Sequence, residues 1–140
     1  MDHPARPGDL VPIQRTECVE LLADAMFVRI GFIVDGRPMI LPVNHVMHQG
    51  AVYFRTGPGS KLGTAAADGF VAVEADEGDE DRRIGWSVVA HGPASIVTDE
   101  AEAESLHGLS FEPWALPDDR AFWVRVDVQD ISGRRILRTE

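Results

Sequence analysis

Two cations and two hydroxyl groups fall within seven residues of the chain, in the segment 55–61, which reads Arg-Thr-Gly-Pro-Gly-Ser-Lys. The segment follows an apolar run and precedes an alanine-rich stretch, so we expect it to join the end of a strand to the start of a helix. Fixed positive charge, short hydrogen-bond donors and free backbone N–H groups are what a phosphate monoester requires. The segment predicts a phosphate site formed by Arg55, Thr56, Ser60 and Lys61.

Each of these cations, taken alone, would be ordinary solvated surface. The context favours a site, because the Gly-Pro-Gly turn lets the backbone approach a ligand closely and Ser60 is a suitable helix N-cap. The segment is also a local positive site in a chain of 140 residues with a formal charge of −10.

The overall acidity argues against nucleic acid and against an anionic membrane surface as partners, since both need a basic footprint. No apolar run approaches the roughly 18 residues of a membrane-spanning helix. The polar, proline-rich N-terminus is not typical of a signal peptide, and a single cysteine, Cys18, fits a reducing compartment. We therefore expect a cytoplasmic protein with a small-molecule partner.

Metal and nucleophile chemistry have little support in the sequence. His45 and His48 are three residues apart on an expected strand, where they would point to opposite faces. The other histidines have no ligand-like spacing, and the chain has no Gly-x-Ser-x-Gly motif. We predict no metal site and no catalytic side chain.

The hydrophobic pattern predicts a mainly β protein. Residues 1–12 are expected to be a mobile arm and residues 13–140 a single domain. We expect helices at about 16–25, 60–68 and 99–109, strands at 26–34, 38–46, 51–55, 70–75, 86–97 and 121–128, and a short edge strand at 131–137. Asp35-Gly36 predicts a hairpin turn, and 76–83 and 111–119 are expected to be loops. Hairpin-linked strands favour a closed or partly closed antiparallel barrel of six to seven strands with peripheral helices.

Several short motifs follow one another along the chain. They are Leu41-Pro42-Val43-Asn44, Tyr53-Phe54-Arg55-Thr56, Gly59-Ser60-Lys61, Gly85-Trp86-Ser87-Val88, Phe122-Trp123-Val124-Arg125 and Ile131-Ser132-Gly133-Arg134-Arg135-Ile136. Their order and spacing resemble the pyridoxamine 5′-phosphate oxidase-like, FMN-binding split-barrel proteins, in the branch of short bacterial, often actinobacterial, members. The resemblance runs from about residue 17 to residue 136.

This resemblance implies a homodimer with two FMN sites at the subunit interface. It implies that Pro42, Val43 and Asn44 line the isoalloxazine ring, that the predicted phosphate site holds the FMN phosphate, and that Trp86 and Ser87 lie near the flavin. It further implies substrate contacts at His45, Trp123 and Arg125.

The activity implied is that of an FMN-dependent oxidoreductase acting on a small molecule, in which the flavin carries the hydride and the protein binds and orients. Two alternatives remain open: a reductase that uses a deazaflavin on the same fold, and a flavin-binding module without turnover. The chain lacks the longer C-terminal segment of basic substrate contacts that pyridoxamine phosphate oxidases carry.

Overall fold

The computed structural model describes residues 4–66, 69–109, 111 and 120–137. The helices are α1 (Arg15–Asp24), α2 (Lys61–Ala66) and α3 (Glu100–His107). The strands are β1 (Leu10–Pro12), β2 (Val28–Val34), β3 (Arg37–Val43), β4 (Val46–His48), β5 (Ala51–Thr56), β6 (Phe70–Asp79), β7 (Ile84–Ile96), β8 (Phe122–Asp127) and β9 (Asp130–Ile136). The predicted mainly β, antiparallel architecture is confirmed.

All strand pairs are antiparallel, and the path through the sheet runs β3-β2-β6-β7-β8-β5-β4. The first part of β7 also pairs with β9, whereas its last residues pair with β8, so one long strand belongs to two sheets. Only residues 44 and 45 separate β3 from β4, although these strands stand at opposite ends of the path. This short connection brings the two ends of the path together and closes the barrel. The change of partner along β7, from β9 to β8, divides the barrel into two sheets.

Gly92 marks the point where β7 changes partners. A Cβ atom at Gly92 would lie 1.7 Å from the carbonyl oxygen of Asp127, at the end of β8. Two residues after Asp127, the backbone N–H of Gln129 donates to the carbonyl of His91, the residue before Gly92, at 2.8 Å. The chain can cross this closely only over a residue without a side chain.

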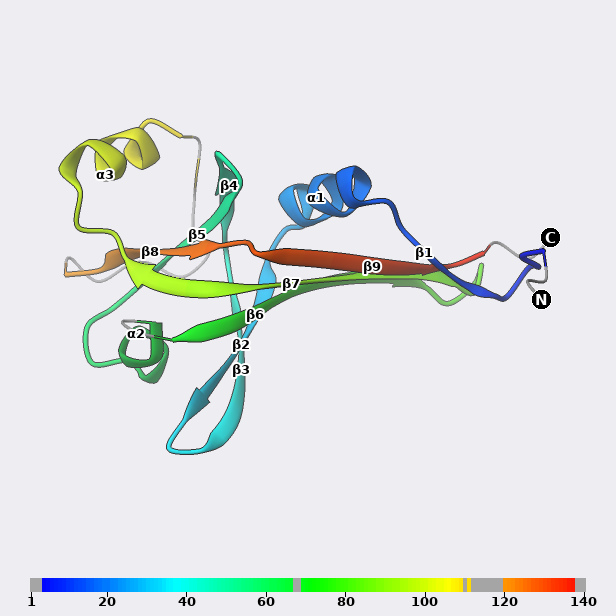
Figure 1. Cartoon of the computed structure of the whole chain (residues 1–140), viewed down its shortest axis with the longest axis horizontal. Helices are drawn as coiled ribbons and strands as arrows, with labels where there is room; N and C mark the ends of the chain where they lie inside the picture. Colours follow the sequence, from blue (N-terminus) through cyan, green and yellow to red (C-terminus); the bar gives the residue numbers. More distant parts are fainter. Residues whose placement is uncertain (1–3, 67–68, 110, 112–119, 138–140) are drawn as a thin grey trace.

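The β6, β7 and β9 strands extend past the barrel as a long arm, which α1 covers near its base (Figure 1). We call these three strands the β6–β7–β9 arm. The β2–β3 hairpin projects in another direction and turns at Asp35 and Gly36, whose φ angles of 50° and 76° match the predicted two-residue turn.

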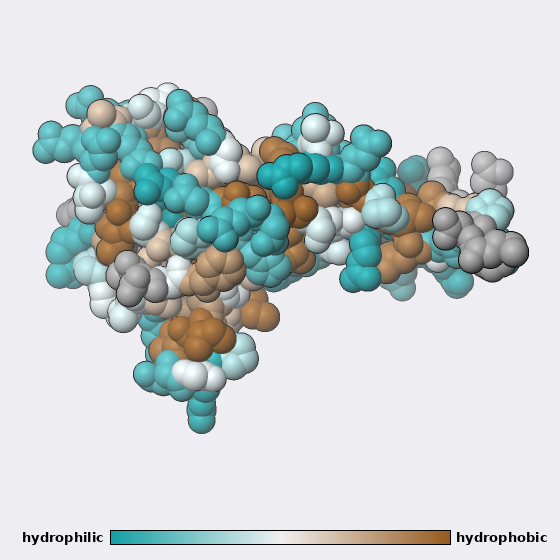
Figure 2. Space-filling view, in the orientation of Figure 1, coloured by the Kyte–Doolittle hydropathy of each residue, from teal (hydrophilic) through white to brown (hydrophobic). Residues whose placement is uncertain are grey.

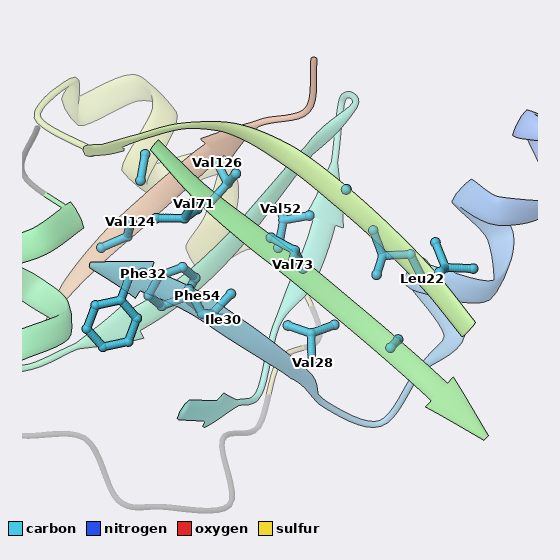
Figure 3. Packing of buried hydrophobic residues seen from close by; sticks show 14 of the residues in the cluster. Leu22, Val28, Ile30, Phe32, Val52, Phe54, Val71, Val73, Val124 and Val126 are labelled. Carbon is cyan, nitrogen blue, oxygen red and sulfur yellow. The ribbon is translucent and has the colours of Figure 1, made fainter. Parts of the chain in front are cut away.

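The barrel core is built from alternate residues of its strands, as half-buried strands require. Side chains from β2, β5, β6 and β8 meet in the interior, where Leu22 of α1 joins them (Figure 3). A second, smaller cluster lies beneath α3 and contains Ala51, Tyr53, Leu106 and Trp123. Because β5 packs on the core with one face and beneath α3 with the other, its first four residues are all buried.

Helix α1 packs closely on β9. A Cβ atom at Gly133 would lie 2.9 Å from the Cys18 Sγ, so the absence of a side chain at Gly133 allows α1 to pack this closely. Cys18 is completely buried, and burial raises the pKa of its thiol. Cys18 therefore acts as a small core residue.

Three sequence expectations need correction. The N-terminal segment 1–12, expected to be mobile, includes a strand, since Leu10–Pro12 pairs with β9. The expected edge strand, β9, is not an edge, because it lies between β7 and β1. The charged segment 76–83 is not all loop, because β6 continues to Asp79 and pairs with the start of β7. Backbone pairing there tolerates charged side chains that remain in solvent.

The loop expected over 111–119 falls, after Phe111, outside the described residues. Across the ranges that the structure describes, no helix has the length and apolar character needed to span a membrane.

Candidate functional site

The two hydroxyl residues of the predicted phosphate site lie where β5 ends and α2 begins; we call segment 55–61 the β5–α2 corner. Arg55 directly precedes Thr56 in β5, so the side chains of these two residues point to opposite faces of the strand. The hydroxyl oxygens of Thr56 and Ser60 are 2.9 Å apart. Ser60 Oγ also accepts the backbone N–H of Gly63 at 2.9 Å, which makes Ser60 the N-cap of α2. A Cβ atom at Gly63 would lie 2.9 Å from that same oxygen, so the glycine leaves room for the cap.

Among the residues that the structure describes, neither cation of the corner has a carboxylate partner. Arg55 donates to the carbonyl of Ala121 at 3.3 Å, and its guanidinium carbon lies 5.6 Å from the ring centroid of Trp123. The Arg55 Nε is buried without a hydrogen-bond partner. Lys61 is exposed and is the only lysine in the sequence. Since the chain is acidic, two cations left without carboxylates form a place for an external anion.

The predicted ring segment leaves the β4–β5 pair at the same end as the corner. In that pair Val46 faces Tyr53, so the chain continues toward Asn44 on one strand and toward Arg55 on the other. Asn44 is anchored by its side-chain amide, which donates to the carbonyl of Met26 at 3.3 Å. Pro42 is exposed and Val43 is half-buried against the core.

His45, an expected substrate contact, lies against helix α1. Its side chain is only 9% exposed, and its Nε2 lies 2.7 Å from the carbonyl of Leu22 in α1. Because a carbonyl only accepts, Nε2 carries the proton and the buried, unpartnered Nδ1 carries the lone pair. Burial lowers the pKa of His45, so the ring is neutral. With its polar edge against a main-chain carbonyl, His45 presents no open face to a substrate.

Trp123 and Arg125 are likewise engaged inside the protein. Trp123 is 6% exposed and packs against Phe111, with ring centroids 5.2 Å apart. Arg125 Nη1 donates to both carboxylate oxygens of Glu102 in α3, at 2.6 and 2.8 Å. Tyr53 donates to the same carboxylate at 2.7 Å. This network fastens α3 to the barrel; it engages Arg125, whose side chain remains 33% exposed, while Trp123 is buried.

The electrostatics of this network are consistent with a structural role. Burial, followed by the neighbouring Glu102, raises the pKa of Tyr53 to about 12. The Tyr53 hydrogen bond and Arg125 hold the pKa of Glu102 below its usual range. Tyr53 is therefore a neutral donor and Glu102 a fixed carboxylate across the physiological range.

Trp86 and Ser87 lie on the β6–β7–β9 arm and are successive residues of β7, so their side chains point to opposite faces. Trp86 shares its face with the buried Val88 and Ala90, which makes this the core-side face. A cavity of about 480 Å³ opens on that face beneath α1. Trp86 lines the cavity, whereas Ser87 does not.

None of the four corner residues lines this cavity. The structure therefore divides the predicted cofactor residues between the β5–α2 corner, the connection from β3 to β4, and the arm. Within the parts of the chain described, no group of three or more His, Cys, Asp or Glu side chains has the arrangement of a metal site.

The sequence profile of the pyridoxamine 5′-phosphate oxidase family matches residues 14–135. The chain belongs to this family. Among its relatives is the uncharacterized protein Rv0080 of Mycobacterium tuberculosis, which is 37% identical over 96% of this chain and 90% of its own length.

Solved structures of similar proteins share the fold closely. An FAD-binding protein from Mycobacterium smegmatis is 38% identical, with a TM-score of 0.78 over 89% of this chain and 98% of its own. A protein from Corynebacterium glutamicum is 30% identical, with a TM-score of 0.80 over 99% of both chains. The split-barrel fold expected from the sequence motifs is thus confirmed for this family member.

Several residues of the arm and of α1 were not predicted as site residues, although they line the cavity beside Trp86. They include Glu17, Glu77, Asp79 and Arg135. The signal was present in the alternation of β6, where Val71, Val73 and Ala75 continue on the same face into Glu77. It was missed because the charge run from residue 76 was interpreted as a solvated loop.

Proposed function

We propose that this chain is a flavin-binding oxidoreductase of the pyridoxamine 5′-phosphate oxidase family, with the flavin phosphate bound at the β5–α2 corner. The observation that carries the proposal is the pair of linked hydroxyls of Thr56 and Ser60, each next in sequence to a cation, Arg55 or Lys61, that has no carboxylate partner among the described residues. Family membership and a 38% identical relative that binds FAD support it. FMN, the form expected from the sequence, and FAD both carry the phosphate that such a site would hold.

In this proposal the flavin supplies the hydride chemistry, and the residues of the chain bind and orient it. Arg55 and Lys61 neutralise the phosphate, while the hydroxyls of Thr56 and Ser60 add hydrogen bonds. Pro42, Val43 and Asn44 provide an apolar backbone surface for the ring at the same end of the β4–β5 pair. The substrate is a small molecule, and the single, buried Cys18 suits a reducing cytoplasm.

The first test is the absorption spectrum of the purified protein before and after addition of FMN and desalting. Retained flavin bands are expected, and chromatography of the released cofactor identifies FMN or FAD. A colourless protein that binds a deazaflavin tightly would assign the same site to the alternative cofactor. A flavin-loaded protein without NAD(P)H- or oxygen-linked turnover would point to the binding module.

The phosphate assignment has its own test in the double variant Arg55→Ala/Lys61→Ala. Charge-assisted hydrogen bonds contribute about 1.5–3 kcal/mol each, so flavin affinity should fall at least about 100-fold. The matched control is Arg37→Ala, an exposed cation at the β2–β3 turn, which should leave affinity unchanged. Full flavin occupancy in the double variant would overturn the assignment.

Lys61 permits a second test, because the chain has no other lysine. An amine-selective acetylating reagent can modify only Lys61 and the N-terminal amine. Bound flavin should protect Lys61 while the N-terminal amine reacts at the same rate, which provides an internal control. Equal acetylation of Lys61 with and without flavin would contradict phosphate binding there.

We further propose that the functional unit is a homodimer. Apolar side chains gather on the projecting β2–β3 hairpin (Figure 2), where Ile33 and Ile40 are 58% and 67% exposed. Such a patch is typical of an interface. Pro38 and Pro42 keep the exposed edge of β3 from adding another strand, which favours side-chain packing between copies. Ile40→Glu should halve the mass measured by light scattering, whereas Arg37→Glu at the hairpin tip should not.

A further inference from the structure

The core-side face of the β6–β7–β9 arm carries a row of three side chains. Glu77 of β6 faces Trp86 of β7, and Trp86 faces Arg135 of β9. Directly opposed residues on one face of an antiparallel sheet lie within contact distance. The indole therefore has a carboxylate on one side and a guanidinium on the other.

The two ends of this row differ in their partners. Arg135 is bound to Glu17 of α1, so its charge is already matched. Glu77 has no hydrogen bond or ion pair within the described residues and is exposed to solvent. Asp79 is the next residue of β6 on the same face. One of its carboxylate oxygens accepts hydrogen bonds from the backbone N–H groups of Asp81 and Arg82. The carboxylate beside the indole is thus free to take an external cation.

The cavity above this row has the size of a ligand site. Its volume of about 480 Å³ falls within the usual range for small-molecule pockets. Leu21, Ile84 and Ile136 supply apolar walls. Three carboxylates and one guanidinium among its lining residues give a formal charge of −2. This balance disfavours anions and favours a ligand with a positive charge and an apolar body.

We propose that this cavity binds a small organic cation, specifically an aromatic amine in its ammonium form. The ammonium group is held between the Glu77 carboxylate and the face of the Trp86 indole, where cations bind favourably. The aromatic ring rests against Leu21 and Ile84. No residue of the β5–α2 corner takes part in this proposal, which assigns to the amine Trp86, a residue that the family resemblance places near the flavin.

Three probes of one shape and different charge test it on the full-length protein: benzylammonium, benzyl alcohol and benzoate. Binding is followed by the NMR signal of the Trp86 indole N–H. Benzylammonium should bind with a Kd on the order of 1 mM, the alcohol at least tenfold more weakly, and benzoate not at all. Equal binding of the alcohol, or no binding of benzylammonium at tenfold higher concentration, would overturn the proposal.

Two variants locate the charge. Glu77→Gln should weaken benzylammonium binding at least tenfold, whereas Glu80→Gln, in the turn beyond the arm, should not change it. Lys61→Ala should also leave it unchanged, which separates this result from the flavin test. Competition by FMN would mean that the cavity holds the flavin ring, and it would refute a separate amine site.

Discussion

The β5–α2 corner and the β6–β7–β9 arm treat charge in opposite ways. The corner has two linked hydroxyls and, next to them in sequence, two cations without a carboxylate partner among the described residues, in a chain with ten more negative than positive charges. The cavity of the arm is lined by one guanidinium, which is already paired with Glu17 of α1, and by two further carboxylates on β6. One chain thus presents a site suited to an anion and a cavity suited to a cation. In both regions the local arrangement of charged side chains, and not the net charge of the chain, is the basis of the proposed ligand.

Strand β7 connects the two regions, because its first part builds the arm and its last residues pair with β8 beside the corner. The largest effect is therefore expected from Gly92→Ala. The new Cβ would collide with the Asp127 carbonyl, where no side chain can move aside. We expect a loss of more than about 3 kcal/mol of unfolding free energy in urea titration, with both regions disrupted.

The matched control for this substitution is Gly31→Ala in β2. A Cβ there would meet only the Ala72 methyl group at 3.6 Å, an ordinary contact. Its effect should stay below about 1 kcal/mol. If both variants unfold at the same urea concentration, the close crossing at Gly92 does not limit the fold.

The next effect concerns His45, which ties α1 above the arm to the connection from β3 to β4. Burial lowers the pKa of His45 in the folded state, so the unfolded chain binds the proton more readily. Stability should be constant above about pH 6.5 and fall as the pH decreases below it, with a slope of at most about 1.4 kcal/mol per pH unit from this group.

The variant His45→Phe removes this titration. Between pH 5 and 7, the unfolding free energy of this variant should depend less steeply on pH, because the contribution of His45 is gone. The variant also loses the hydrogen bond to Leu22. A His48→Phe variant serves as the control, because His48 is only half-buried. An unchanged slope in His45→Phe would assign the acid sensitivity to other groups.

A smaller effect separates the corner from the arm. Ser60→Ala removes the oxygen that caps α2 and bonds to Thr56, which should cost about 1 kcal/mol of stability. Flavin affinity should fall about fivefold to tenfold by the loss of one hydrogen bond. Calorimetric titration should show that benzylammonium binding at the arm is unaffected. A parallel loss at both regions would show that they are coupled.

The smallest effect is expected at the network that fastens α3. Tyr53→Phe removes the hydroxyl that donates to Glu102, while Arg125 still holds that carboxylate. The cost should be about 1 kcal/mol, measured by thermal unfolding, without loss of flavin. Release of flavin by Tyr53→Phe would instead connect α3 to the corner through Trp123 and Arg55.

Much of the architecture was determined by the sequence itself. The alternation along β2, β5, β6 and β8 and the turn at Asp35-Gly36 depend on local backbone preferences, and these elements were predicted within a few residues. The contact between Thr56 and Ser60 at the corner has the same local origin, because a strand end and a helix start four residues apart are sufficient to bring the two hydroxyls together.

Only the tertiary structure decided the rest. Trp86 and Ser87 are neighbours in sequence, yet a strand places them on opposite faces, and only Trp86 lines the cavity. His45, Trp123 and Arg125 were expected to meet a substrate, but residues distant in sequence, Leu22, Leu106 and Glu102, bury or pair them. The row of Glu77, Trp86 and Arg135 depends on the register of three strands. Register is set by the packing of the whole barrel, which no short segment of the sequence contains.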